Sequence, residues 1–210
     1  RRSSDLFPMN ELKKSTWFPL AVVFAAVYFF SMNGLGALPG LAISFLLKEK
    51  IALTPAELAY FQAITLIAWV IKPLWGVISD LYPIFGSRRK AYLILMSFIA
   101  AGAWCCLALT AEFTAWILLI FITLAYMAYA FQDVVADGLM VETGQALNMT
   151  GQFQSIQWTS VYIAMIITAL VGGWIAGLAQ KGQLTYSLIF GITAVFPILT
   201  AIIAAFLIRE

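Results

Sequence analysis

This 210-residue sequence contains no histidine, and charged residues make up only 10% of it. The absence of histidine removes the commonest protein metal ligand and the usual proton carrier near neutral pH. Only two cysteines are present, Cys105 and Cys106, and they are adjacent within an apolar run. That arrangement argues against both a zinc site and a disulfide framework.

Apolar surface, by contrast, is abundant. Hydrophobic residues make up 63% of the sequence, whereas soluble domains contain about 45–50%. A compact fold of this size leaves too large a share of its surface in water to hide so many apolar side chains. We therefore predict an all-α integral membrane protein, and at about 20 residues per span the length allows about six transmembrane helices.

Six spans are predicted, near residues 17–38, 55–81, 91–111, 114–142, 153–179 and 184–208. No charge occurs between Ser15 and Leu47, a stretch too long for one helix across a hydrocarbon core of about 30 Å. We expect this helix to bend or end at the glycines and proline of residues 34–40, with an interfacial extension to Leu47.

Local signals add detail to the second and fifth spans. Thr54, Pro55 and Glu57 predict a capped helix start for the second span. The fifth span contains a GxxxG step, Gly173 and Gly177, with Gly172 and Ala176 beside it, which predicts close helix packing.

The basic residues predict the orientation. By alternation of the spans eight of them share one side, namely Arg1, Arg2, Lys13, Lys14, Arg88, Arg89, Lys90 and Arg209. Only Lys48, Lys50 and Lys181 lie on the other side. The first side should be cytoplasmic, which places both termini inside. Residues 1–14 are then a cytoplasmic segment without the pattern of a cleavable signal peptide, and residues 15–210 form the membrane bundle.

A short internal repetition suggests how the bundle is built. Phe61-Gln62-Ala63-Ile64 lies near the start of the second span, and Phe153-Gln154-Ser155-Ile156 lies near the start of the fifth. The same offset carries the third span onto the sixth. Because a shift of three helices reverses orientation, the pattern predicts a 3+3 inverted repeat.

Ionisable residues inside the spans are the first functional candidates, because they are costly in a membrane. Lys72 lies eight residues before Asp80, about 12 Å along a helix, which is far for its ammonium to reach the headgroups. Asp133 in the fourth span lies at a similar depth, and Asp137 follows one turn later on the same face. We expect Lys72 to pair with these carboxylates.

Two interpretations of this charged group stay open with equal weight. Two neighbouring carboxylates in a low-dielectric site cannot both ionise cheaply, so one of them should hold a proton. A proton-coupled carrier without histidine needs such a group. Alternatively, the three charges only neutralise one another.

Neutral polar residues form a second candidate group. Amides and an indole can hydrogen-bond and stack on a polar heterocycle without burying a charge. The alternative is interhelical hydrogen bonding, which is common in membrane bundles. The candidates are Gln154, Gln157 and Trp158 on one face of the fifth span, joined by Asn33 and Gln132.

A third group is predicted at the cytoplasmic ends of the second to fourth spans. Gly76, which allows close approach of a neighbouring helix, and Asp80 end the second span. The following loop carries Gly86, Arg88 and Arg89, and Glu142 near the end of the fourth span is within reach of one of these arginines. The positive-inside rule alone explains the arginines but not the glycine and aspartate before them.

This third group resembles the loop signature of the major facilitator superfamily, a glycine and an aspartate followed by a glycine and paired basic residues. The segment Lys72-Pro73-Leu74-Trp75-Gly76 through Asp80, continuing to Pro83-Ile84-Phe85-Gly86 and Arg88-Arg89, is similar to the folate–biopterin transporter family, in which this loop is longer. Asp133-Val134-Val135-Ala136-Asp137 followed by Glu142 resembles the fourth-helix motif of the same family.

The resemblance implies a twelve-helix transporter that works by alternating access, of which this chain is the N-terminal six-helix bundle. Expected partners are a folate- or pterin-like solute, membrane lipid and a C-terminal six-helix half, with no nucleic acid and no cofactor. Proton coupling is expected, in an inner or plasma membrane or an organelle envelope. Asp133 or Asp137 would accept hydrogen bonds from the amino-pyrimidine edge of a pterin, and Lys72 would attract an anionic tail.

Three alternatives remain open. The closest is a carrier of another organic anion. A membrane-embedded, metal-dependent lipid headgroup transferase would use the acidic pair as metal ligands, but Gly138 is followed by Leu139-Met140-Val141, without the further aspartates of such motifs. A scaffold or receptor that does not transport would keep the buried charges only for neutralisation. We predict a transporter and not an enzyme.

Overall fold

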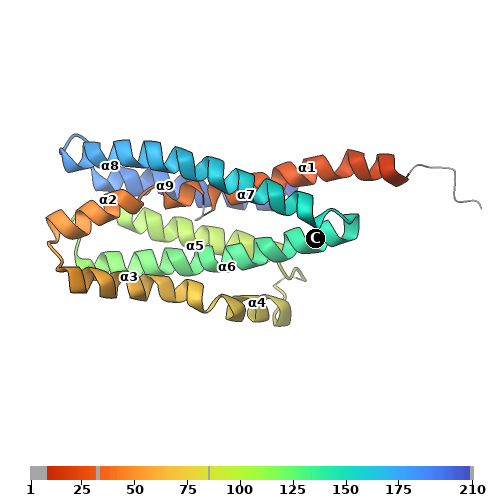
Figure 1. Ribbon diagram of the computed structural model, residues 1–210. Coiled ribbons are helices and arrows are strands. Elements are labelled where there is room, and N and C mark those ends of the chain that lie inside the picture. Colours follow the sequence, from red (N-terminus) through yellow and green to blue (C-terminus); the bar gives the residue numbers. More distant parts are fainter. Residues whose placement is uncertain (1–8, 32–33, 85, 209–210) are drawn as a thin grey trace, which may run out of the picture.

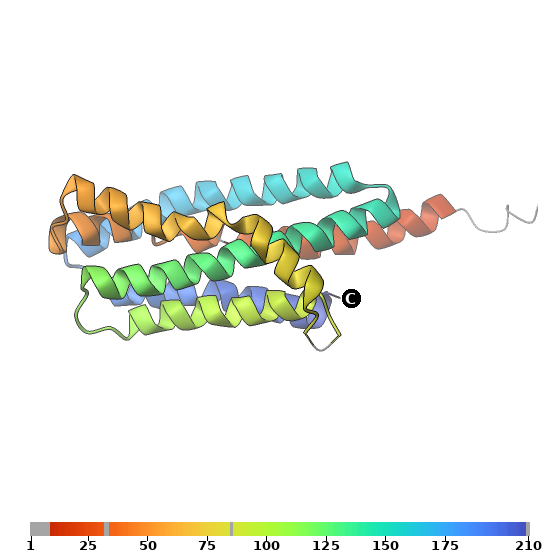
Figure 2. The same ribbon diagram turned by 90° about the horizontal axis from the view of Figure 1, so that it is seen from below.

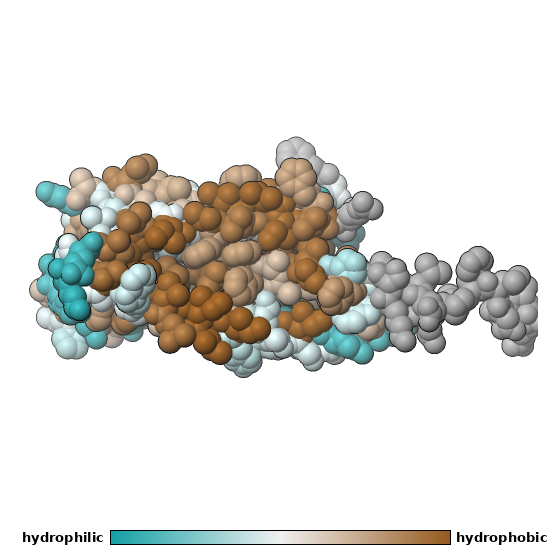
Figure 3. Space-filling view, turned by 90° about the horizontal axis from the view of Figure 1, so that it is seen from above, coloured by the Kyte–Doolittle hydropathy of each residue, from teal (hydrophilic) through white to brown (hydrophobic). Residues whose placement is uncertain are grey.

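A computed structural model of the chain describes residues 9–31, 34–84 and 86–208. Within that part, six helical segments are long and apolar enough to cross a membrane, as the composition predicts. The segments run side by side along one common axis (Figures 1 and 2). A broad hydrophobic band covers the middle of one face, with hydrophilic residues gathered toward the ends (Figure 3). The all-α membrane fold is therefore confirmed.

The elements alternate long helices with short interruptions. In chain order they are α1 (Met9–Phe30), η1 (Leu35–Ala37), α2 (Gly40–Phe45), η2 (Leu46–Lys50), α3 (Pro55–Val70), α4 (Lys72–Leu81), α5 (Lys90–Ala108), α6 (Ala115–Leu147), α7 (Thr150–Ile167), η3 (Thr168–Gly172), α8 (Gly173–Gln180) and α9 (Tyr186–Leu207). The second to sixth predicted spans match these segments closely, whereas in the first span α1 covers Met9–Phe30 and the prediction was 17–38. Among the other five the largest difference is at the end of α6. That helix continues five residues past Glu142 and ends where Asn148 adopts a left-handed conformation.

The first span bends where the glycines and proline predicted it, but its second half was interpreted wrongly. The segment from α2 to η2 is not an interfacial extension: Ala42, Leu46 and Leu47 are buried, and α2 packs against α8 (Figure 1). Close approach is possible because a Cβ on Gly172 would lie only 2.9 Å from the Leu38 carbonyl oxygen.

The glycine step of the fifth span does not make the predicted contact. A Cβ on Gly173 or Gly177 would meet no described atom within 4 Å. The neighbouring Gly172 is the residue on which the first and fifth spans pack closely.

The second span begins with the predicted cap and is broken near its middle. The Thr54 backbone N–H and hydroxyl donate to Glu57 Oε2 at 2.8 and 2.7 Å, and the Glu57 N–H donates to Thr54 Oγ1 at 3.3 Å. Helix α3 ends at Val70, and Pro73, which has no N–H, lies in the first turn of α4. The Trp75 indole donates to the Ala68 carbonyl at 3.0 Å, so a side chain satisfies a carbonyl near the break.

Replacing Thr54 by alanine should lower the free energy of unfolding by about 1 kcal/mol, because it removes the oxygen that caps α3. Reversible unfolding in mixed micelles measures this change. Ser155→Ala is the matched control, because the Ser155 hydroxyl donates only to the carbonyl of Gly151 in its own helix. Equal stability changes in the two variants would contradict the capping role.

Burial is uneven among the six spans. Helix α5 packs between α6 and α9, and Trp104 near its C-terminal end donates to the Tyr129 hydroxyl at 3.1 Å. In contrast, the most apolar stretches of the α3–α4 and α7–α8 spans are only 17% and 28% buried, whereas the corresponding stretches of the other four spans are 44–50% buried. The two spans with the most exposed surface thus carry Lys72 and Gln157. The inverted repeat stays a prediction.

Candidate functional site

The break in the second span places Lys72 beside the fourth span. Lys72 is the first residue of α4, which packs against α6, and its ammonium forms an ion pair with Asp133 Oδ2. The Lys72 side chain is 31% exposed, whereas that of Asp133 is 8% exposed. The Lys72 Nζ also lies 5.2 Å from the centre of the Trp69 ring, a distance at which a cation is attracted to an aromatic face. The predicted partners are therefore in contact.

Asp137, one turn further along α6, is bound by two other helices. Its Oδ1 accepts a hydrogen bond of 2.6 Å from the Tyr28 hydroxyl of α1 and one of 3.0 Å from the Gln157 amide of α7. Lys72, Asp133, Asp137, Tyr28 and Gln157 form what we call the central polar cluster. It joins four of the six spans, and both carboxylates share one face of α6.

Other predicted members lie outside this cluster. Gln132 donates instead to Ser97 Oγ of α5 at 2.7 Å. It therefore makes an interhelical hydrogen bond, which was the alternative to solute binding for this group. Gln154 is exposed, and Trp158 is 48% exposed with its ring 5.8 Å from that of Tyr162. Asn33 lies outside the described residues.

Tyr28 is the member that the sequence did not predict. It lies in a long charge-free segment, where a tyrosine has the same pattern as the phenylalanines beside it. Only the packing of α1 against α6 and α7 shows that its hydroxyl meets a carboxylate.

The third predicted group is assembled around Arg89. Its Nη2 lies 2.8 Å from Glu142 Oε1 and 3.3 Å from Asp80 Oδ1, so Arg89 rather than Arg88 reaches Glu142. We call these three residues the Arg89 cluster. Gly86 has φ +78°, a conformation that suits glycine, and it shapes the preceding turn. Gly76 does not provide a close approach, because a Cβ there would make an ordinary contact of 3.4 Å with Val134.

The basic loop also holds the end of the sixth span. Lys90 Nζ donates to the carbonyl oxygens of Ala205 at 2.9 Å and Ile208 at 2.7 Å. These carbonyls belong to the C-terminal end of α9, where a positive charge is favourable. The sequence predicts Lys90 on the basic side of the membrane, but it does not indicate this contact with the carbonyls of α9.

Gly138→Ala should break the Arg89 cluster while leaving the fold intact. A Cβ at this position would overlap the Arg89 guanidinium, which must then move away from Glu142. The free energy of unfolding should change by less than about 1 kcal/mol, because partly exposed ion pairs contribute little. Protease cleavage in the loop of residues 82–89 should become faster. Gly102→Ala is the control, since a Cβ there meets no described atom within 4 Å; equal cleavage of both variants would contradict the role of Gly138.

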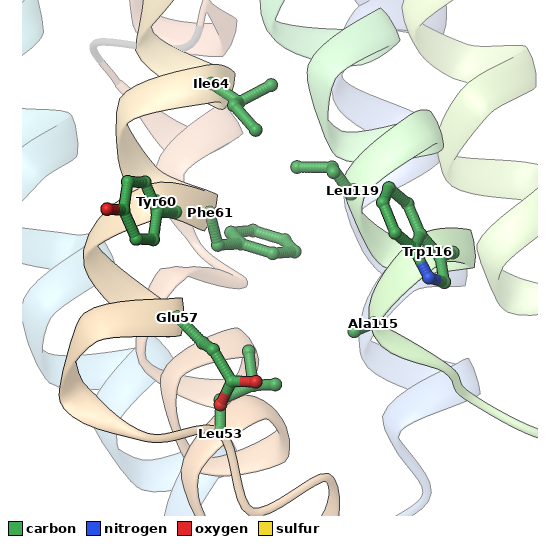
Figure 4. Close-up of a pocket in the computed structure, with 8 residues that line it drawn as sticks. All are labelled: Leu53, Glu57, Tyr60, Phe61, Ile64, Ala115, Trp116 and Leu119. Atoms are coloured by element: carbon green, nitrogen blue, oxygen red, sulfur yellow. The ribbon is translucent and has the colours of Figure 1, made fainter.

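A groove of about 260 Å³ opens between α3 and α6, away from the central polar cluster. Figure 4 shows Phe61 of α3 pointing toward Leu119 of α6, with Glu57 at one end. One oxygen of that carboxylate is occupied by Thr54, and the rest of the lining is mostly apolar. The groove thus offers a surface for lipid chains rather than a polar solute.

No group of three or more metal-ligating side chains occurs among the described residues. The described residues define a six-span membrane protein with a partly buried, charged polar cluster between its helices. The chain belongs to the BT1 family, which it matches over residues 33–210.

Curated relatives agree with this family. The chain is 35% identical over 199 residues to a folate-biopterin transporter of Synechocystis sp., covering 93% of this chain and 38% of that protein. It is 30% identical over 152 residues to folate transporter 1 of Plasmodium falciparum (71% of this chain, 30% of that protein). It is 28% identical over 161 residues to the probable folate-biopterin transporter 4 of Arabidopsis thaliana (75% and 33%). The chain thus spans only 30–38% of the length of these relatives, and no solved structure matches it.

Proposed function

We propose that this chain is the N-terminal six-helix half of a secondary transporter that moves folate, a pterin or a related organic solute by alternating access. The names of the relatives support the solute class, and their greater length supports a second half. The basic end of the bundle, with both termini, is cytoplasmic in this proposal. Solute would lie between the two halves, against the sparsely buried α3–α4 and α7–α8 spans.

The central polar cluster is the observation that carries the proposal. Tyr28 and Gln157 both bind Asp137 Oδ1, and within the described residues Oδ2 makes no hydrogen bond. Oδ2 can therefore accept a hydrogen bond from the amino-pyrimidine edge of a pterin, and the two partners on Oδ1 hold the carboxylate in place. Hydrogen bonds to a charged acceptor are the strong ones.

The ion pair of Lys72 with Asp133 supplies the coupling in this proposal. A proton that arrives on Asp133 cancels its charge and releases the Lys72 ammonium, which then attracts an anionic solute. The Arg89 cluster holds the cytoplasmic ends of the second to fourth spans together in one of the alternating states.

A carrier of another organic anion is the second candidate. It is favoured by the same Lys72 ammonium, whose partial exposure makes it available to any anion that reaches this depth.

Uptake by the full-length protein tests the proposal. It should be expressed in a folate-requiring host that lacks its own uptake system, beside this chain alone, and the accumulation of folic acid and biopterin measured at two external pH values. Uptake by the full-length protein only, and faster at the acidic pH, is the expected result. Membrane-inserted full-length protein that accumulates neither compound would overturn the solute assignment, and uptake of other organic anions would then support the second candidate.

A further inference from the structure

A second cavity lies on the same face of α6 as the carboxylates. It has a volume of about 220 Å³, is partly open, and is lined mainly by residues of α2, α3 and α6. Tyr126 in its wall precedes Asp133 by seven residues and Asp137 by eleven. Because these spacings are close to two and three helical turns, the three side chains form one stripe, about 16 Å long. Gln62 on α3 lies opposite, ten residues before Lys72.

Two polar side chains of this cavity, those of Gln62 and Tyr126, make no hydrogen bond to the described residues. In contrast, the hydroxyls of Ser44 and Thr65 are bonded to carbonyls of their own helices. The Gln62 side chain is exposed and that of Tyr126 is half-buried, so both can hydrogen-bond a ligand that enters the cavity.

The chemistry of the cavity suits an uncharged, planar group that bears an amide. Besides Gln62 and Tyr126, its wall is mainly apolar, with Phe61 and Ile122 among the lining residues. A side-chain amide can donate to and accept from another amide, and a tyrosine hydroxyl can do either. An adjoining cavity of about 410 Å³ shares Gln62 and is lined by Lys48, whose ammonium provides a positive charge beyond it.

We propose that this cavity is a second subsite, which binds the arylamide part of a folate-type conjugate. The inference rests on the proposed function. With the heterocycle at Asp137, the arylamide lies between Gln62 and Tyr126, and the carboxylate tail extends toward Lys48. A free pterin is too short to occupy both ends of the stripe. The subsite therefore discriminates long conjugates from free pterins.

The test compares two solutes in the full-length protein that contains this chain. Gln62→Leu combined with Tyr126→Phe should raise the half-saturating concentration for folic acid about ten-fold, while that for biopterin changes less than about two-fold, because only the long solute loses hydrogen bonds. p-Aminobenzoylglutamate alone should compete with folic acid in the original protein and compete less well in the double variant. The matched controls are Tyr60→Phe, at a tyrosine that is 72% exposed on the other side of Phe61, and Gln152→Leu on the exposed face of α7.

The outcomes separate the two proposals. Equal losses for folic acid and biopterin, or no loss for either, would overturn the subsite while leaving the transporter intact. An original protein that inserts in the membrane but takes up neither solute would overturn the proposed function, and the subsite with it.

Discussion

Asp133→Asn should lower the free energy of unfolding by about 3 kcal/mol, the low end of the range for breaking a buried ion pair, because Lys72 is partly exposed. The substitution keeps the shape of the side chain but leaves the Lys72 ammonium without its carboxylate in the middle of the second span. An uncompensated charge at that depth is costly. Reversible unfolding in mixed micelles measures the loss, and a change below about 0.5 kcal/mol, typical of a surface position, would contradict the pairing.

A double variant separates the two interpretations of this ion pair. Lys72→Met with Asp133→Leu removes both charges, and such replacements are often neutral for stability, so most of the lost free energy should return. If the pair only neutralises charge, the double variant should also transport normally. If the pair couples protons to solute, as we propose, folic acid uptake should stay at least about ten-fold below that of the original protein, the effect of about 1.4 kcal/mol on a rate. Measuring the free energy of unfolding and the folic acid uptake on the same preparations decides between the two interpretations.

Depth along the membrane was predictable from the sequence, since helical rise is constant. Counting residues from Asp80 and Glu142 placed Lys72 level with Asp133 and brought an arginine near Glu142, and the structure shows both contacts. The cap at Thr54 was predictable for a related reason, because its partners are only three residues apart.

Rotation of the helices about their axes was not predictable. Apolar residues surround most spans of a membrane protein, so no polar face reveals which side meets a neighbour. For this reason Gln132 was grouped with the polar residues of the fifth span although it faces α5, and Tyr28 was overlooked although it contacts Asp137. The burial of α2 depends on the long-range contact of Leu38 with Gly172, which no local signal indicates.

Asp137→Asn should leave the fold intact and reduce folic acid uptake. An asparagine oxygen can accept the same bonds from the Tyr28 hydroxyl and the Gln157 amide, so the packing of α1, α6 and α7 is kept. The variant loses the negative charge, and it replaces one of two acceptor oxygens by a donor. A hydrogen bond to a charged group contributes about 1.5–3 kcal/mol, so uptake should fall about ten- to hundred-fold.

Two further variants show whether the loss comes from solute recognition or from packing. Tyr28→Phe removes one of the hydrogen bonds to Asp137 Oδ1 but keeps the carboxylate, so it should reduce uptake less than Asp137→Asn. Asn148→Asp changes charge at the end of the same helix, far from the cluster, and should transport normally.

Because Asp137 lies at the heterocycle end of the proposed stripe, its substitution should reduce the uptake of biopterin as much as that of folic acid. The variants at Gln62 and Tyr126 should affect folic acid alone, so the two sets together locate each end of the solute. Undiminished uptake of both compounds by Asp137→Asn would remove this carboxylate from the mechanism.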